Sequence, residues 1–493
     1  MKKSDATPFG SKTRQSYVAI LLIIYKSYRI IVRQAWPFLI YFVIGGSGKK
    51  SHFLIGIIIF AVLGMVFSII KFFRYYFYIK DDELVIEQGV LKKSKTIVPF
   101  ERVQTINFEQ NIIHRIFDVV KLKVDTAGSA GNELEFEAIS HRTADQLREI
   151  LLSKKQQKVV TSGDGQTKPS QPEYRRIMSL ELPQLLRAGM VENHLKSGGL
   201  IFVAMFWIWQ SADEVGMADR VEDPLSTIEY GLQLMSVLAV VFVIASFLIS
   251  LVRMVIRNYE LQFLRSSRGF KLQAGLFTRR DVSALDHKIQ VISWADNPLK
   301  KLIGIKDLRL RQAASQAINS KKTIKIPGCT MSHLHDVTAS LYGPHYDAGI
   351  VYESIHPAYF HRVALYVGLV ASLLAGFFYY VGSMPMLAGV TVATVALLLT
   401  RYLSMKKKRY GINDQMLIIH GGSYGDKTEV LPIYKIQSCS LSRSPYQRRK
   451  GLASVVIHTA SGRVGVPYVT MTQAQHLMDI LLYRVERDHR KWM

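Results

Sequence analysis

Long apolar segments alternate with charged segments along this chain, and they predict helices that span a membrane. Residues 53–70, 230–252 and 363–400 contain no charged side chain. About 18–20 apolar residues carry a helix across the hydrocarbon core of a bilayer. The third segment is long enough for two spans, with residues 382–385 as the turn between them.

Two shorter apolar runs, at residues 34–48 and 197–212, stand just before the first two long segments. Alone they would fit buried core helices as well as membrane spans. Because each directly precedes a strong span, we interpret them as the first legs of helical hairpins. The chain is therefore predicted to contain roughly six spans, arranged as three hairpins.

After each hairpin the pattern changes to short alternations of polar and apolar residues, which are typical of β-strands. In the first such region, turn signals occur at Asp81-Asp82 and at Gln88-Gly89. Apolar residues at helical spacing follow in residues 142–154, and similar helical patterns close the two later regions. Each unit is thus predicted as a hairpin, several short strands and one helix.

One stretch of this pattern occurs three times, at residues 97–126, 282–311 and 430–459. The copies share a glutamine, a basic residue two places before it and a glycine further upstream. These residues are Arg102 and Gln104, Lys288 and Gln290, and Lys435 and Gln437, with Gly89, Gly275 and Gly422 upstream. Such a repeat indicates one domain-sized structural unit used three times. We expect the basic residues and glutamines to shape a bend between strands; a ligand site facing lipid headgroups is the alternative.

The predicted organisation has eight parts. They are a basic N-terminus with an interfacial helix at 1–33, hairpin 1 at 34–70, domain 1 at 71–153, a linker at 154–176, a pre-membrane segment with hairpin 2 at 177–256, domain 2 at 257–343, a pre-membrane segment with hairpin 3 at 344–403, and domain 3 at 404–493. Residues 1–14 are polar and are expected to be frayed. The linker lacks apolar periodicity, which is typical of a flexible segment.

Charge adds an orientation to this organisation. The 493 residues are 49% hydrophobic and carry a net charge of +25. Basic residues gather beside the apolar segments, for example at Lys71, Arg253 and residues 406–409, whereas the loop at 213–229 is net acidic. Positive residues stay on the cytoplasmic side of a membrane. We therefore predict a multi-pass cell-membrane protein with cytoplasmic domains and extracellular hairpin loops; two lysines in the first loop oppose this and are outnumbered.

Basic clusters within the domains predict contacts with anionic membrane lipids, because each nearby Lys or Arg contributes about 1 kcal/mol at such a surface. The candidate residues are Lys92, Lys93, Lys95, Arg279, Arg280, Lys300, Lys301, Arg448, Arg449 and Lys450. For the first cluster, a charged strand edge that prevents pairing is an equal alternative. Nucleic-acid binding is not indicated, because the sequence has no reading helix or stacking module.

The sequence offers no set of residues typical of catalysis or of a metal site. Phosphate-loop and His-Glu-x-x-His motifs do not occur. The glycine-rich residues 421–425 are interpreted as a turn, since no helix follows them. His333 and His335 fit a solvated helix start better than a metal site. Cys329 and Cys439 lie in different repeats and are interpreted as buried or inert thiols. We expect a non-enzymatic protein without a cofactor.

The repeated motif, placed directly after a hairpin, resembles the bacterial membrane-flanked domain, a family of bacterial PH-like domains. The additional matching residues are Pro99, Pro298, Pro432, Pro445, Gly304 and Gly451. The first copy departs from the pattern at Ile112 and Asp118, and the second departs at Leu285. The resemblance covers nearly the whole chain and is found in particular with three-domain members of Gram-positive bacteria.

This resemblance implies an α+β membrane protein. Each of three transmembrane helical hairpins would be followed by a PH-like, bent and near-closed antiparallel sheet with a C-terminal helix. It also implies a small one-domain relative as a partner, and it carries no active site across. The favoured function is a scaffold or subunit of a membrane complex in envelope maintenance or stress resistance. A lipid-handling or transport-like component is the alternative, although the nearly uncharged spans are untypical of transporters.

Overall fold

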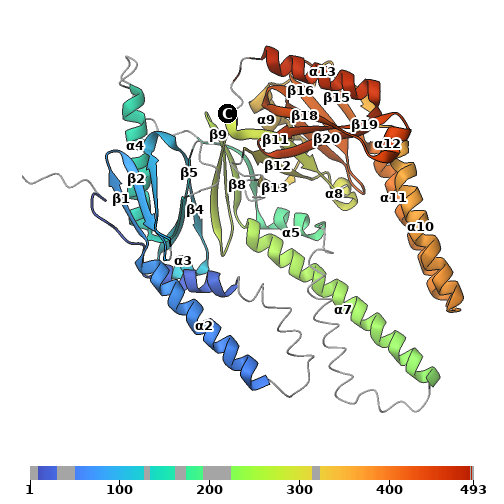
Figure 1. Cartoon of the computed structure of the whole chain (residues 1–493), viewed down its shortest axis with the longest axis horizontal. Coiled ribbons are helices and arrows are strands. Elements are labelled where there is room, and N and C mark those ends of the chain that lie inside the picture. The colour runs from blue at the N-terminus through green and yellow to red at the C-terminus, as the bar shows by residue number, and fades with distance from the viewer. Residues whose placement is uncertain are drawn as a thin grey trace, which may run out of the picture. The chain divides into compact units, whose positions relative to one another are not determined.

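A computed structural model describes residues 9–29, 50–90, 92–126, 134–160, 174–192, 224–313, 323–488 and 490 of the chain. The chain divides into two compact units (Figure 1). The first unit contains the chain up to Glu173 together with Phe277–Ser283, and the second contains Tyr174–Leu276 and Ala284–Met493. Each unit is an α+β structure of antiparallel strands and apolar helices.

Four long apolar helices occupy the strongly apolar segments of the sequence. They are α2 (Lys50–Phe73), α7 (Pro224–Asn258), α10 (Ala358–Tyr380) and α11 (Met384–Lys407). Among the described residues, α10, α11 and the Val240–Asn258 part of α7 are long and apolar enough to cross a membrane. Most apolar side chains of α10 and α11 are exposed in the protein, as helices that face lipid require.

Helices α10 and α11 form the third predicted hairpin, and their connection includes Gly382 with a φ of +74°. Glycine adopts this left-handed conformation at little cost, so it permits a short turn between the two helices. The predicted first legs of the other two hairpins, residues 34–48 and 197–212, lie outside the described residues.

In the first unit, strands surround one apolar core. The elements are β1 (Tyr76–Lys80), β2 (Glu83–Gln88), β3 (Ser94–Pro99), β4 (Val103–Gln110), β5 (Val119–Thr126), β6 (Leu134–Ser140), α3 (Ile112–Ile116), α4 (His141–Val160) and β10 (Arg279–Leu285) up to Ser283. Strands β1, β2 and β3 form one sheet, and β6, β5, β4 and β10 pair in that order. Phe77, Leu84, Leu122 and Phe136 from these strands are fully buried, and Leu147 of α4 covers them.

The segment before the first hairpin also packs on this unit, so the expectation that residues 1–14 are frayed is wrong for the described residues from Phe9 onwards. Thr13 and Phe77 exchange two backbone hydrogen bonds of 2.9 Å, and Phe9 packs against the core. Residues 18–29 form a helix that buries Leu22 and leaves Tyr25 exposed. A helix with one apolar packed side and an exposed aromatic and basic side is typical of a membrane interface.

The second unit contains two further copies of the strand pattern. The elements of the first are β7 (Arg175–Leu180), α5 (Leu182–Met190), β8 (Leu261–Ser266), β9 (Gly269–Ala274), β11 (Ile289–Ala295), α8 (Pro298–Leu302), β12 (Lys306–Gln312), β13 (Thr323–Cys329) and α9 (Met331–Tyr342). Those of the second are β14 (Val351–Ser354), β15 (Arg409–Ile412), β16 (Met416–Gly421), β17 (Lys427–Pro432), β18 (Ile436–Ser442), α12 (Pro445–Arg449), β19 (Leu452–Thr459), β20 (Gly462–Thr470) and α13 (Met471–Arg487).

Strands β13, β12, β11, β17, β16, β15 and β14 form one antiparallel sheet in that order, so the second and third repeats share a sheet. Strands β18, β19 and β20 form another sheet. The core of the third repeat contains Leu417, Leu431, Ile457 and Leu481, and it also contains Val291 from β11 of the second repeat. The second and third repeats therefore share one sheet and part of one core, and they are not independent domains joined by a linker.

In each repeat a strand from before the membrane segment pairs with the first strand after it. Strand β7 pairs with β8, and β14 pairs with β15, across the intervening helices. Thr13 makes the corresponding bridge to β1 in the first unit. The predicted order placed every strand after the hairpin, and it did not include this strand. The described hairpin of α10 and α11 is thus inserted between β14 and β15, the first two strands of its domain.

The repeated glycines adopt the conformation that the alignment predicts. The φ angles are +123° at Gly89, +118° at Gly275 and +120° at Gly422. A side chain at Gly422 would place its Cβ 2.2 Å from the carbonyl oxygen of Gly425, so both φ and space require glycine there. The glycine-rich segment therefore forms the predicted turn, between β16 and β17. Of the predicted linker, residues up to Val160 are helical and residues 161–173 lie outside the described part.

Candidate functional site

The basic residue of the repeated motif ends a single 3-10 turn in every copy. These turns are η2 (Phe100–Arg102), η4 (Asp286–Lys288) and η6 (Ile433–Lys435), and each connects two strands. Lys288 and Lys435 are buried, whereas Arg102 is exposed. Gln290 is buried and Gln437 is exposed, and the side chain of Gln104 lies outside the description. The motif therefore places the same residues at a bend in each repeat but in different surroundings.

Lys435 lies at the contact between the second and third repeats. Its Nζ donates a hydrogen bond to the backbone carbonyl of His287, which belongs to the equivalent turn of the second repeat. Burial lowers the pKa of Lys435 to about 8, although the nearby Asp286 carboxylate opposes this shift. A buried lysine at this place ties the two turns together, so it is not available to a headgroup.

Most residues of the proposed lipid-facing clusters are exposed. Lys92, Lys93, Lys95, Arg279, Arg448, Arg449 and Lys450 lie on the surface. Arg280 lies opposite Glu109 in the pairing of β10 with β4, and Lys301 forms an ion pair of 2.7 Å with Asp426.

Lys300 corrects the expectation of a lipid-facing residue, because its side chain is only 4% exposed. Its Nζ lies 2.6 Å from the Asp307 carboxylate and 2.7 Å from that of Glu192. These two carboxylates raise the pKa of Lys300 against the opposing effect of burial. A cation that is buried and neutralised in this way stabilises the domain and cannot reach a lipid.

The position of Lys300 is polar and buried in all three repeats, which sequence reasoning missed. The equivalent residues are His114 and Gln447, each 3% exposed. Each is the third residue of a one-turn helix, and its backbone N–H donates to the N-cap side chain of Asn111, Asn297 or Ser444. The side chains find different partners: the His114 ring bonds to the Glu137 carbonyl at 2.8 Å, and the Gln447 amide donates to the Ser454 hydroxyl at 2.7 Å.

The histidines and cysteines singled out in the sequence have structural surroundings. His333 accepts a hydrogen bond of 3.3 Å from the Thr330 backbone and thereby caps α9. Burial raises the pKa of the Cys329 thiol to about 12 and that of Cys439 to about 11, so both are weak nucleophiles. In the described part of the chain, no group of three His, Cys, Asp or Glu side chains is placed to hold a metal ion.

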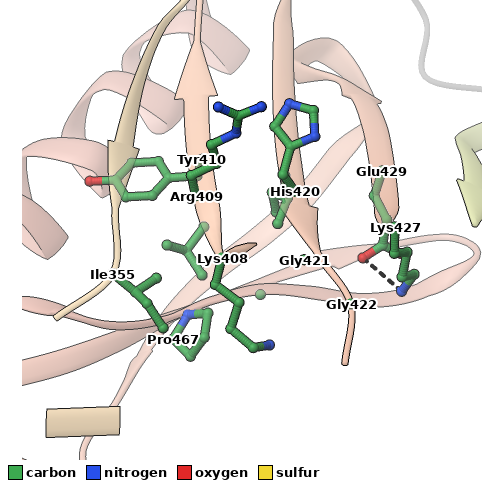
Figure 2. A pocket seen from close by; sticks show the side chains of 13 residues that line it. Ile355, Lys408, Arg409, Tyr410, His420, Gly421, Gly422, Lys427, Glu429 and Pro467 are labelled. Atoms are coloured by element: carbon green, nitrogen blue, oxygen red, sulfur yellow. Dashed lines mark ion pairs between the residues drawn. The ribbon is translucent and has the colours of Figure 1, made fainter. Parts of the chain in front are cut away.

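A basic pocket of about 100 Å³ lies where α11 passes into the third domain (Figure 2). Its cationic side chains are Lys408, the residue that follows α11, and Lys427 on β17. Pro467 of β20 forms part of the wall. Arg409 on β15 and His420 on β16 also border the pocket, but strand pairing places their side chains on the opposite face of the sheet from Lys427. The pocket thus combines residues from four parts of the domain immediately after a membrane-spanning helix.

The charges of this pocket are unequal. Its one carboxylate, Glu429, is already bound by Lys427 at 3.0 Å and by Arg311 at 3.1 Å. Lys408 lies 5.2 Å from the ring of Tyr359. Burial lowers the pKa of Lys408, and the nearby Lys427 lowers it further. Two nearby positive charges in a partly enclosed site attract an anion, which relieves their repulsion.

His420 belongs to a neighbouring cluster on the opposite face of this sheet. Its Nδ1 lies 3.0 Å from the hydroxyl of Thr428, and its ring packs 4.8 Å from the ring of Tyr352. Burial, together with Arg409, lowers the pKa of His420 below its ordinary value. Lys408 and Lys427 are therefore the two cationic groups of the pocket that suit a phosphate-sized anion. The only sequence signal for the pocket is the basic run at 406–409, which indicated orientation alone.

These observations define an α+β membrane protein with three PH-like domains, each built around apolar helices. The model of the bacterial PH domain family matches residues 21–155, 214–344 and 363–485, and the chain belongs to this family. It is similar to the UPF0699 transmembrane protein YdbT of Bacillus subtilis (strain 168), with 24% identity over 404 residues. The alignment covers 79% of this chain and 80% of that protein.

Proposed function

We propose that this protein is a non-enzymatic membrane scaffold, a subunit of a membrane complex that supports envelope maintenance or stress resistance. Its domains would bind anionic lipid headgroups at the inner leaflet and hold protein partners there. The observation that carries this proposal is the basic pocket of Lys408 and Lys427 directly after α11. A basic site at the end of a membrane-spanning helix lies at the depth of the headgroups, where an anion is always present.

Lipid binding can be tested on the full chain purified in a mild detergent. We expect native mass spectrometry with added phosphatidylglycerol to show bound lipid on the wild type and a loss of at least several-fold in occupancy on the double variant Lys408→Gln, Lys427→Gln. The matched control is Arg448→Gln, Arg449→Gln, which removes the same charge from the exposed end of α12. Equal losses in both variants, or binding of phosphatidylcholine to the same extent, would contradict a headgroup pocket.

The proposal also requires cytoplasmic domains, for which the basic flanks of the apolar segments are the support. In a background of Cys329→Ser and Cys439→Ser, a cysteine replacing Ser226 near the start of α7 should react with an impermeant maleimide in intact cells. A cysteine replacing Arg449, which is exposed on α12, should react only after the cells are permeabilised. The reverse pattern of labelling would overturn the orientation.

A small one-domain member of the same family remains part of the proposal as a partner. The exposed surfaces of the domains, including uncovered sheet edges, support this partner. Purification from the native host in a mild detergent should recover such a protein together with this chain, at a constant ratio through size-exclusion chromatography. Recovery of this chain without a smaller family member would remove that partner and leave the lipid-binding scaffold.

A further inference from the structure

The same strand-to-strand contact joins successive repeats twice in this protein. Strand β4 of the first repeat pairs with β10, which the sequence repeat assigns to the second. Strand β11 of the second repeat pairs with β17 of the third. In both cases the strand that follows the 3-10 turn of one repeat binds the strand that precedes the 3-10 turn of the next.

The two contacts also have the same register. The shared glutamines serve as the reference for the alignment. The residue five places after the glutamine of one repeat lies opposite the residue ten places before the glutamine of the next repeat. This pair is Glu109 and Arg280 in the first contact, and Ala295 and Lys427 in the second. One rule of register used twice indicates a general way in which these domains join, because register in a sheet is set by the side chains that it buries.

Burial shows what the contact achieves. Six of the seven residues of β11 are buried. Ile292 and Val430 lie opposite each other across the junction, and both are 0% exposed. Beyond the paired strands, the Asp426 backbone N–H donates to the Asp296 side chain at 2.6 Å, and Arg311 binds Glu429.

The third repeat has the same strand without a following repeat. In the described part of the chain, β18 pairs with β19 alone and forms the edge of its sheet. Gln437, Ser438, Ser440 and Ser442 on β18 are exposed. A polar sequence does not prevent the contact, since β4 is also rich in polar residues and is covered by β10. An uncovered strand of this kind invites pairing with another chain.

The first repeat has the complementary strand, also without a partner on one side. Strand β3 pairs with β2 alone among the described strands. Ile97 on β3 is 48% exposed, whereas Val430, the equivalent residue of β17, is fully buried in the junction. Among the described residues, the third repeat therefore leaves one half of the repeated contact uncovered, and the first repeat leaves the other half uncovered.

We propose that β18 of one copy of this protein pairs with β3 of a second copy, in the register of the two internal contacts. Ser442 of one copy then lies opposite Ser94 of the other, and Ile97 becomes covered. Because the two surfaces differ, the contact is head to tail and can repeat from copy to copy as an open array in the membrane plane. The partner of β18 is assigned to a second copy because, among the described strands, β3 is the only strand preceding a 3-10 turn that has no neighbour on its outer side.

Charge sets the strength of this contact. In the predicted register Lys93 lies opposite Arg443, whereas the equivalent residues of the first internal contact are Arg279 and the neutral Gln110. Like charges directly opposite each other weaken a strand pair. The association should therefore be reversible and should strengthen when salt screens these charges. A Lys93→Glu substitution places opposite charges at this pair and should strengthen the contact further.

Crosslinking between two distinguishable copies tests the pairing. Both copies carry Cys329→Ser and Cys439→Ser and different tags; one also carries Ser442→Cys and the other Ser94→Cys, at exposed positions. A short bismaleimide applied to membranes that contain both copies should give a product of dimer size with both tags. The control replaces Ser442→Cys by Ser438→Cys, four residues away, about 13 Å along the strand. We expect at least a five-fold lower yield from the control.

Two results would overturn the proposal. One is the absence of a two-tag product with Ser442→Cys even after Lys93→Glu is added, which would mean that the edge lysines keep β3 unpaired. The other is equal yields from Ser442→Cys and Ser438→Cys, which would mean random collision in the membrane. A several-fold gain on adding Lys93→Glu, confined to the Ser442→Cys pair, would support the predicted register.

Discussion

Strands β11 and β18 occupy the same place in the second and third repeats, yet their surroundings differ. Six of seven residues are buried in β11, but only Ile436 is buried in β18. The difference follows from what lies beside each strand, since β17 covers β11 and β18 is an edge. The sequence has adapted to it: β18 carries Ser438 and Ser442 where β11 carries Val291 and Ala295.

This comparison shows that equivalent positions of a repeat share the same backbone structure but can differ in burial and in neighbouring residues. The buried polar position shows the same thing. In the second repeat, Lys300 is held by two carboxylates, whereas the third repeat has Gln447, which needs only neutral partners. A covered domain can surround a charge with distant residues, and an end domain with fewer neighbours uses a local hydrogen bond.

The largest expected effect comes from breaking the ion pairs of the second domain. Lys300→Met leaves the largely buried Asp307 carboxylate, and the partly exposed Glu192 carboxylate, without their cation, which costs about 3 kcal/mol of folding free energy. Thermal unfolding of the full chain in detergent should show a large decrease in midpoint. Lys301→Met is the control, because its surface ion pair with Asp426 contributes little. Equal midpoints for the two variants would contradict the buried ion pairs.

A smaller loss is expected from crowding the junction itself. A Cβ at Gly425 would lie 2.0 Å from the backbone oxygen of Asp296, so Gly425→Ala must separate the ends of β11 and β17, at a cost of about 1–3 kcal/mol. Hydrogen exchange should then become faster in β11 and approach the rate in β18. Gly421→Ala is the control, since its nearest neighbour is a lysine side-chain carbon at 3.7 Å. Unchanged protection of β11 in Gly425→Ala would argue against the shared sheet.

The buried Lys435 predicts a dependence of stability on pH. Its pKa is lowered to about 8 in the folded protein, so between this pH and its unfolded pKa of roughly 10.4 the unfolded chain binds more protons. Stability should therefore rise with pH above 8, by at most about 1.4 kcal/mol per pH unit. The measurement is the difference in unfolding midpoint between wild type and Lys435→Met from pH 7 to 9.5. A difference that stays constant over this range would contradict the lowered pKa.

The smallest effect should come from the neutral counterpart of Lys300. Gln447→Met keeps the volume but removes the hydrogen bonds to the Ser454 hydroxyl and the Ser444 backbone, a loss of about 1 kcal/mol. The unfolding midpoint should decrease by much less than in Lys300→Met. An equal or larger decrease would show that the charge at this position is not what distinguishes the two domains.

Much of the architecture follows from the sequence because its signals are local. Uncharged segments mark the described membrane helices, and the spacing of Gly89, Gly275 and Gly422 marks equivalent turns with equivalent φ angles. Strands β7 and β14 were missed because the sequence of a membrane segment separates each of them from the strand with which it pairs. The four residues of β14 are all exposed, so they show no alternation of apolar and polar side chains.

The sites depend on contacts between distant residues, and these were less accessible to prediction. Lys300 has the composition of a surface cluster, but Glu192 and Asp307 approach it only in the folded chain. The basic pocket combines Lys408 with residues from β16, β17 and β20. A sequence shows how many charges a segment has, and only the fold determines which of them neutralise one another.

The insertion of the hairpin of α10 and α11 between two paired strands has a consequence for biosynthesis. Tyr352 on β14 pairs with Gly411 on β15, and helices α10 and α11 leave the ribosome between them. The domain can close only when both helices have crossed the bilayer, so that β14 and β15 lie on the same side of it. If only one of the two helices crossed the bilayer, β14 and β15 would lie on opposite sides of the membrane and could not pair. The sheet can therefore form only in a correctly inserted chain. In a misinserted chain the unpaired strands would be exposed to proteases.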